Sequence, residues 1–171
     1  MRFDLFENMN AEEAEDILRE FREHGGGYLK DVVPNGELDF SLCGFPNLME
    51  SISNRLTTIL KDDDVSVPEF IRNTEDYRSG LFEFAPDARR LIIGCAFYLG
   101  ECFIRKYPGL RWAIGNPQYA TGMMPVVAGF NSEKELPALL VMENLFSRRI
   151  TNPTMTSVFE NAIQRWEKNS S

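Results

Sequence analysis

Apolar positions are most concentrated between Pro86 and Lys106, where they predict one long helix. From Leu91 to Ile104 the only charged residue is Glu101, so apolar side chains would point almost all the way round this helix. The uninterrupted apolar run of about 14 residues is shorter than the roughly 20 residues that span a bilayer. The pattern therefore predicts a central helix that other elements of the same domain cover.

Further helices are predicted on both sides of this central segment. Asn10 is a good N-cap, Glu13 stands at the third helical position, and the glycines at 25–27 end the first of these helices. The apolar spacing and the helix-starting residues of the remaining sequence predict helices at Pro46–Leu60, from Pro68 onward, at Glu135–Ile150, and after Asn152 with Pro153 at the first position.

Strands are predicted where the apolar period changes to two. Tyr28–Val33 and Glu37–Leu42 flank the turn sequence Pro34-Asn35-Gly36, which predicts a β-hairpin, and Leu81–Phe84 predicts one short strand. After the central helix, turn residues separate three segments that predict an antiparallel meander: Leu110–Ile114, Gln118–Thr121 and Pro125–Phe130.

The 171 residues contain no internal repeat and no long linker. With 43% hydrophobic residues, a chain of this length can bury one core of useful size. The sequence therefore predicts a single α+β domain over residues 1–171, with a central buried helix, a small antiparallel β-meander and flanking helices.

Charge is unevenly distributed along the chain. The net charge is −8, and residues 1–85 alone carry 19 Asp and Glu against 8 Lys and Arg. A negative protein is repelled by nucleic-acid phosphates and by anionic lipid surfaces, so we expect neither nucleic acid nor a membrane as partner. The first residues also lack the basic start and apolar run of a signal peptide, which favours a cytoplasmic protein.

The acidic residues of the N-terminal half predict a surface for a basic protein partner. Carboxylates on the first predicted helix and in the run after Lys61 are the candidate contacts: Glu12, Glu13, Asp16, Glu20, Asp62, Asp63 and Asp64. The alternative is that these residues keep the protein soluble and that the Asp run is a solvated loop.

Recognised catalytic and cofactor motifs are absent from the sequence. It contains no GxSxG, GxxxxGK[ST], HExxH or CxxC pattern and no GxGxxG after a strand, so we predict no catalytic residue, cofactor or metal site. His24 is the only histidine, and the three cysteines lack metal-type spacing. An enzyme thus remains less expected than a binding protein.

Glu101 is the one residue that supports an alternative function. A carboxyl group on an apolar helix can act as a general acid or base, and a pocket between the central helix and the meander would also include Tyr98, Arg111 and Trp112. The structural alternative is an ion pair with Arg105, which lies four residues further along the helix.

Part of the chain resembles a group of small bacterial proteins. The sequence Tyr98-Leu99-Gly100-Glu101 followed by Leu110-Arg111-Trp112, Pro125-Val126-Val127 and Gly129-Phe130 is similar to theirs, in which a helix leads into a strand bearing a tryptophan. The resemblance covers about residues 95–145 and implies the helix-then-meander fold without any activity. The first functional hypothesis is therefore a protein that neutralises a basic partner, as bacterial toxin-immunity proteins do, and the second is an enzyme or small-ligand binder.

Overall fold

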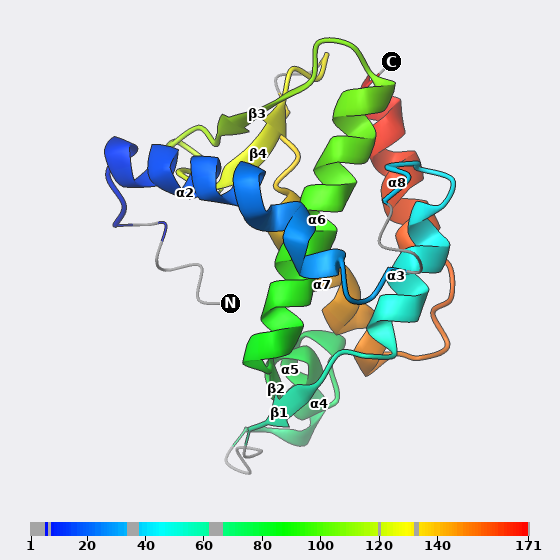
Figure 1. Cartoon of the computed structure of the whole chain (residues 1–171). Helices are drawn as coiled ribbons and strands as arrows, with labels where there is room; N and C mark the ends of the chain where they lie inside the picture. Colours follow the sequence, from blue (N-terminus) through cyan, green and yellow to red (C-terminus); the bar gives the residue numbers. More distant parts are fainter. Residues whose placement is uncertain are drawn as a thin grey trace.

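The computed structural model describes residues 6, 8–33, 38–61, 67–119, 121–131 and 134–170. Helices predominate, and four short strands lie between them along the chain (Figure 1). In chain order the elements are α2 (Ala11–His24), the 3₁₀ helix η1 (Gly25–Leu29), α3 (Phe45–Ser53), β1 (Thr58–Leu60), α4 (Glu69–Arg72), α5 (Glu75–Gly80), β2 (Phe82–Phe84), α6 (Pro86–Lys106), β3 (Arg111–Ile114), β4 (Pro125–Ala128), α7 (Ala138–Thr151) and α8 (Val158–Ser170).

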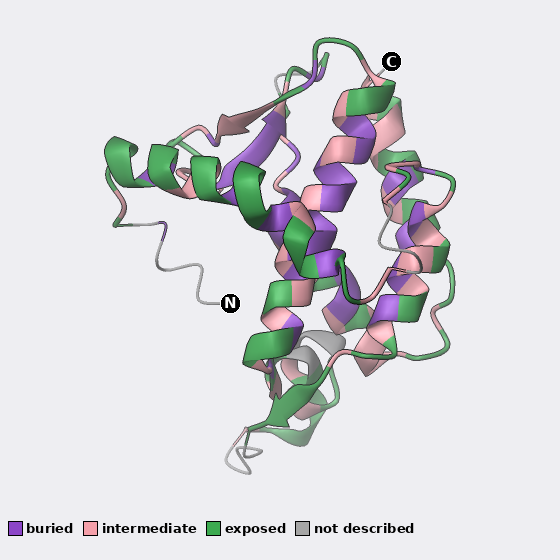
Figure 2. Cartoon of the chain, in the orientation of Figure 1, coloured by how far each residue is buried: buried purple, intermediate pink, exposed green. Residues whose placement is uncertain are grey.

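Helix α6 is the centre of the molecule, and its bounds agree with the prediction. Helix α2 lies on one side of it and helices α3 and α8 on the other, while η1 and α7 pack directly against it (Figure 1). Most of its residues from Ile92 to Phe103 are buried (Figure 2). The α+β fold with a central buried helix is therefore confirmed.

Two small antiparallel sheets lie near opposite ends of α6. Strand β1 pairs with β2, which leads directly into α6, and β3 pairs with β4 after α6. Val127 of β4 also exchanges two backbone hydrogen bonds of 2.9 Å with Leu136, so the chain before α7 continues the second sheet by one bridge.

The predicted middle strand of the meander, Gln118–Thr121, is wrong. Asn116 organises this connection into turns, because its side chain accepts a hydrogen bond from the backbone of Gln118 at 2.9 Å and its carbonyl accepts one from Tyr119 at 3.0 Å. Gln118 and Tyr119 are exposed, Thr121 is partly buried, and no described strand pairs with the segment. Local turn chemistry therefore prevails over the short apolar alternation.

The predicted hairpin before α3 is also wrong. Tyr28 and Leu29 belong to η1, where Leu29 is fully buried against α6, and Leu38–Leu42 pairs with no described strand. A β-carbon at Gly25 would lie 2.8 Å from Phe97, so the glycines allow this segment to approach α6 closely. Packing on the central helix replaces strand pairing; the turn at 34–36 lies outside the described residues.

Three helices are shorter than predicted: α3, α8 and α7, of which α7 begins at Ala138 and not at Glu135. Helix α3 ends at Ser53, because the Ser53 hydroxyl and the Asn54 amide both donate to the backbone carbonyl of Glu50, at 2.7 and 3.1 Å. The following residues, including Ile59 and Leu60, form exposed strand β1 instead of the apolar face of a helix. Helix α8 begins at Val158 and not after Asn152, since residues 153–157 form turns.

Candidate functional site

The outer face of α2 carries the predicted acidic residues. Glu12, Asp16 and Glu20 are spaced four residues apart, which aligns them along one side of the helix, and all three are exposed. The opposite side packs into the core through buried Ala14 and Phe21. We call the row of Glu12, Asp16 and Glu20 the acidic row.

Glu13 has a structural role that sets it apart from the acidic row. Its carboxylate accepts a hydrogen bond of 2.9 Å from the backbone of Asn10, while the Asn10 side chain accepts one of 3.0 Å from the backbone of Glu13. This capping box, predicted from the sequence, satisfies two backbone donors at the start of α2. Glu13 is therefore less available to a partner than its neighbours.

The ion pairs of the acidic row leave its carboxylates accessible. Asp16 pairs with Arg19 at 2.5 Å, a carboxylate oxygen of Glu20 lies 3.9 Å from Nε2 of His24, and each of these side chains is more than half exposed. Such surface pairs contribute about 0–1 kcal/mol and are screened by salt. A partner can therefore replace them at little energetic cost.

The second acidic segment, Asp62–Asp64, lies outside the described residues. Lys61, the residue before it, follows β1 and pairs with Glu83 of β2 at 3.1 Å. This sheet lies at the start of α6, whereas α2 crosses α6 further along, beside β3 (Figure 1). The acidic surface that the structure describes is that of α2.

A groove of about 640 Å³ lies between α2, α6 and β3. We call it the α2–β3 groove; the charged and aromatic residues among those that line it are Glu15, Arg19, Arg22, Glu23, Phe97, Glu101, Arg111 and Trp112. Its described lining contains three carboxylates and three guanidinium groups, so it favours neither sign of charge. Three of the four residues predicted for a pocket thus meet here, namely Glu101, Arg111 and Trp112.

Glu101 is held by structural partners within this groove. Its carboxylate accepts a hydrogen bond of 2.9 Å from the indole nitrogen of Trp112 and pairs with Arg105 at 3.4 Å. The predicted pair with Arg105 is therefore present, and Trp112 adds a second partner from β3. Both partners fix the carboxylate in place, so its geometry is that of a structural link between α6 and β3.

We expect Glu101→Gln to lower the free energy of unfolding by about 1–2 kcal/mol, because it weakens a charge-assisted hydrogen bond and removes an ion pair. Urea denaturation followed by circular dichroism measures this difference. The exposed Glu160→Gln provides a control that should change stability by less than about 0.5 kcal/mol. A Glu101→Gln protein with wild-type stability would contradict the structural role.

Tyr98 does not belong to the α2–β3 groove, contrary to the prediction. Its ring is buried and stacks on Phe40 with centroids 5.3 Å apart, and its hydroxyl donates a short hydrogen bond to Asp39. Burial raises the pKa of Tyr98 above its ordinary value, and the Asp39 bond acts in the same direction. Tyr98 therefore ties the segment before α3 to the central helix as a neutral phenol.

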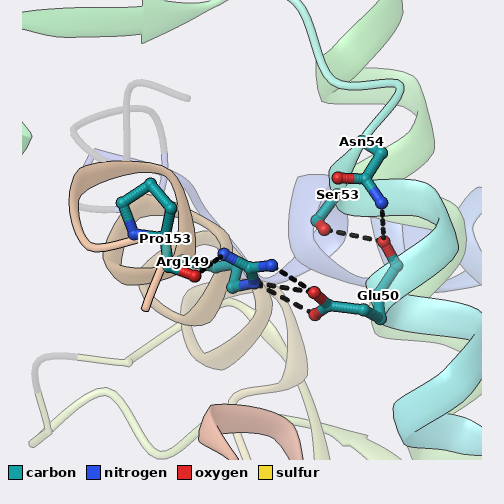
Figure 3. Close-up of polar contacts among 5 residues, drawn as sticks. All are labelled: Glu50, Ser53, Asn54, Arg149 and Pro153. Carbon is teal, nitrogen blue, oxygen red and sulfur yellow. Dashed lines mark hydrogen bonds and ion pairs between the residues drawn. The ribbon is translucent and has the colours of Figure 1, made fainter. Parts of the chain in front are cut away.

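A link between α3 and α7 could not be found from the sequence, because its residues are 99 positions apart. The Arg149 guanidinium donates from Nε to both oxygens of Glu50 at 3.0 Å and from Nη2 to the same carboxylate, while Nη1 donates to the carbonyl of Pro153 at 2.6 Å (Figure 3). The hydrogen bonds from Arg149 lower the pKa of Glu50, and those to Glu50 raise the pKa of Arg149. This contact joins the C-terminal parts of α3 and α7 and stabilises their packing.

The thiols lack the features of a reactive site. Cys95 and Cys102 are buried in α6, and burial raises the pKa of the Cys102 thiol to about 12. Cys43 is exposed. Reactive cysteines instead have a lowered pKa, so the two buried thiols are packing residues.

Within the described residues, no group of His, Cys, Asp and Glu is arranged to hold a metal ion. No described helix combines the length and the apolar character needed to cross a membrane.

Comparison with known proteins gave no match to a family model, to a curated protein or to a solved structure. Function is therefore inferred from the surface and the grooves of this chain.

Proposed function

We propose that this protein binds a basic partner protein through the outer face of α2 and neutralises it, in the manner of bacterial toxin-immunity proteins. The observation that carries the proposal is the acidic row of Glu12, Asp16 and Glu20, exposed along one side of a helix whose other side is packed into the core. A fixed row of like charges creates a field that attracts a basic surface and repels phosphates.

The packing of α2 supports this use. Phe21 contacts Trp112 of β3 edge to face with ring centroids 5.0 Å apart, and Phe97 of α6 at 5.9 Å. The helix is thereby held against both neighbouring elements, so its charges keep their spacing before a partner arrives. Preorganised charges mainly raise the association rate, which makes the rate and its salt dependence the quantities to measure.

We expect the triple variant Glu12→Gln, Asp16→Asn, Glu20→Gln to slow association with the partner about tenfold at low salt and to flatten its salt dependence. The basic partner is first isolated from lysate of the source cell at low ionic strength, and the rates are then measured with purified proteins by surface plasmon resonance. Stability should change little, because these side chains are exposed and the capping box is retained.

The matched control removes three negative charges from other exposed positions: Asp31→Asn, Glu69→Gln and Glu160→Gln. At about 0.1 M salt it should keep the association rate within about twofold of wild type, since long-range steering then falls off over a Debye length of roughly 10 Å. Asp62, Asp63 and Asp64 replaced by Asn test the second acidic segment separately. If no basic protein is retained, or if the acidic-row variant associates as fast as the control, the proposal is wrong.

A second candidate is a small-ligand binder that uses the α2–β3 groove, because the structure brings Glu101, Arg111 and Trp112 together there. Residues of α2 line one side of this groove. A protein bound on the acidic row would therefore lie at the edge of the groove. Association that is fast but insensitive to the acidic-row substitutions would favour the groove over the outer face of α2.

A further inference from the structure

A separate groove of about 460 Å³ lies between α7 and α8. Its volume is within the range of roughly 300–1,000 Å³ that is typical of small-molecule sites. It shares no lining residue with the α2–β3 groove. We call it the α7–α8 groove.

The charged residues that line the described part of this groove are all positive. Arg148 of α7 and Arg165 of α8 line it, and neither Asp nor Glu does. Both arginines are exposed, and within the described chain neither guanidinium has a hydrogen-bond or ion-pair partner. In a protein with a net charge of −8, two unpaired guanidinium groups on facing helices form a local site for an anion.

Two consecutive arginines of α7 differ in their partners. Arg149 is fully engaged by Glu50 and by the carbonyl of Pro153 (Figure 3). Arg148, the residue before it, lines the α7–α8 groove and has no such partner in the described chain. Arg148 also lies in the last turn of α7, where a positive charge stabilises the negative end of the helix dipole. This effect would account for Arg148 alone, and it does not explain why Arg165 lines the same groove.

The floor of the α7–α8 groove is apolar. It is lined by Val141, Leu145, Met155, Val158, Ala162 and Trp166. Four of these side chains remain partly exposed, including the Trp166 ring, which contacts Phe130 at 5.4 Å. An apolar body laid along this floor would remove their remaining surface from water, which contributes about 25 cal/mol per Å².

We propose that the α7–α8 groove binds a small amphiphile, an anionic head group on an apolar tail. A carboxylate or phosphate head lies between Arg148 and Arg165, and its tail covers the apolar floor beside Trp166. Arginine is suited to this role because its planar guanidinium donates paired hydrogen bonds to such heads. The proposal does not depend on the partner-binding function of α2.

Three probes test the proposal by isothermal titration calorimetry: decanoate below its micelle concentration, acetate with the same head, and decyltrimethylammonium with the same tail and the opposite charge. Decanoate should bind saturably and at least about tenfold more tightly than either of the other probes, a difference of about 1.4 kcal/mol. It should also change the fluorescence of Trp166, and this change should disappear in Trp166→Phe, which retains Trp112 elsewhere.

The variant Arg148→Gln, Arg165→Gln should weaken decanoate binding at least about tenfold. The control Arg55→Gln, Arg90→Gln removes the same charge from exposed positions outside the groove and should stay within about twofold of wild type. Equal binding of acetate or of decyltrimethylammonium, equal binding by the two double variants, or no saturable decanoate binding would each overturn the proposal. Thermal unfolding of both variants confirms that they are folded.

Discussion

Replacing Gly100 by alanine is expected to destabilise the protein by about 2–3 kcal/mol, although alanine is the better helix former. A β-carbon at position 100 would lie 2.1 Å from two ring atoms of Trp112, so the indole must move. Trp112 is restrained by stacking on Phe97 and by its hydrogen bond to Glu101, and moving it disturbs both contacts. In a domain of this size the melting temperature should fall by roughly 5–10 °C.

The matched control is Gly80→Ala, where an added β-carbon meets no atom within 4 Å. It should leave stability unchanged or raise it by up to about 1 kcal/mol, because alanine restricts the unfolded chain. Combining Gly100→Ala with Trp112→Leu should cost less than the sum of the two single changes, since the smaller side chain makes room. A Gly100→Ala protein as stable as wild type would show that β3 does not press on α6 at this position.

The central helix could be predicted because all of its signals are local. Pro86 opens it, Pro108 and Gly109 follow its end, and Gly109 adopts the left-handed φ of +100° that favours glycine. Glycine is costly inside a helix, so Gly94 and Gly100 indicate a close neighbour, and at Gly100 this neighbour is Trp112. These inferences need no knowledge of the rest of the chain.

The two strand predictions that failed lie where an apolar alternation has no partner strand. Leu38, Phe40 and Leu42 alternate as in a strand, yet Phe40 has a left-handed φ of +48° and contacts Tyr98 and Arg105. Its ring stacks on the phenol of Tyr98, and the carbon of the Arg105 guanidinium lies 3.8 Å from the ring centre. Such a site is decided by residues about 60 positions away, so a local pattern could not predict it.

Sequence separation also decides which part of the candidate site could be predicted. Glu101 and Trp112 are only 11 residues apart, and the chain turns back after α6, so their contact follows from local connectivity. Tyr98 and Glu101 differ by about 60° around the helix, which directs them to different neighbours. Tyr98 meets Asp39, 59 residues earlier, and so lies outside the groove to which the sequence assigned it.

The second large effect is expected from Glu50→Ala, which should lower the free energy of unfolding by about 2 kcal/mol. The substitution leaves the Arg149 guanidinium, whose side chain is only 15% exposed, with the Pro153 carbonyl as its remaining described partner. Because the Glu50 side chain is 36% exposed, the loss should stay below the range of about 3–5 kcal/mol for a fully buried pair. A double-mutant cycle with Arg149→Ala isolates the coupling between the two side chains.

The same pair should make stability depend on pH in a defined direction. Arg149 lowers the pKa of Glu50 in the folded protein below the ordinary value of 4.5, so the unfolded chain takes up the proton first as the pH falls. The contribution of Glu50 is therefore fully present well above pH 4.5 and is lost as the pH falls through the folded-state pKa. Glu83 and Glu167 also have lowered pKa values and add acid sensitivity, but they do so equally in wild type and in variants at position 50.

The quantity to measure is consequently the difference in unfolding free energy between wild type and Glu50→Gln, from urea titrations between pH 7 and pH 3. It should be constant, at about 1 kcal/mol, down to roughly pH 5.5, and should shrink below pH 4.5 as Glu50 becomes protonated and resembles the neutral amide. Asp16→Asn is the control, because its pair with Arg19 is 57–59% exposed and should give a difference near zero throughout. A wild-type advantage over Glu50→Gln that persists unchanged at pH 3 would show that the carboxylate charge is not what holds α3 to α7.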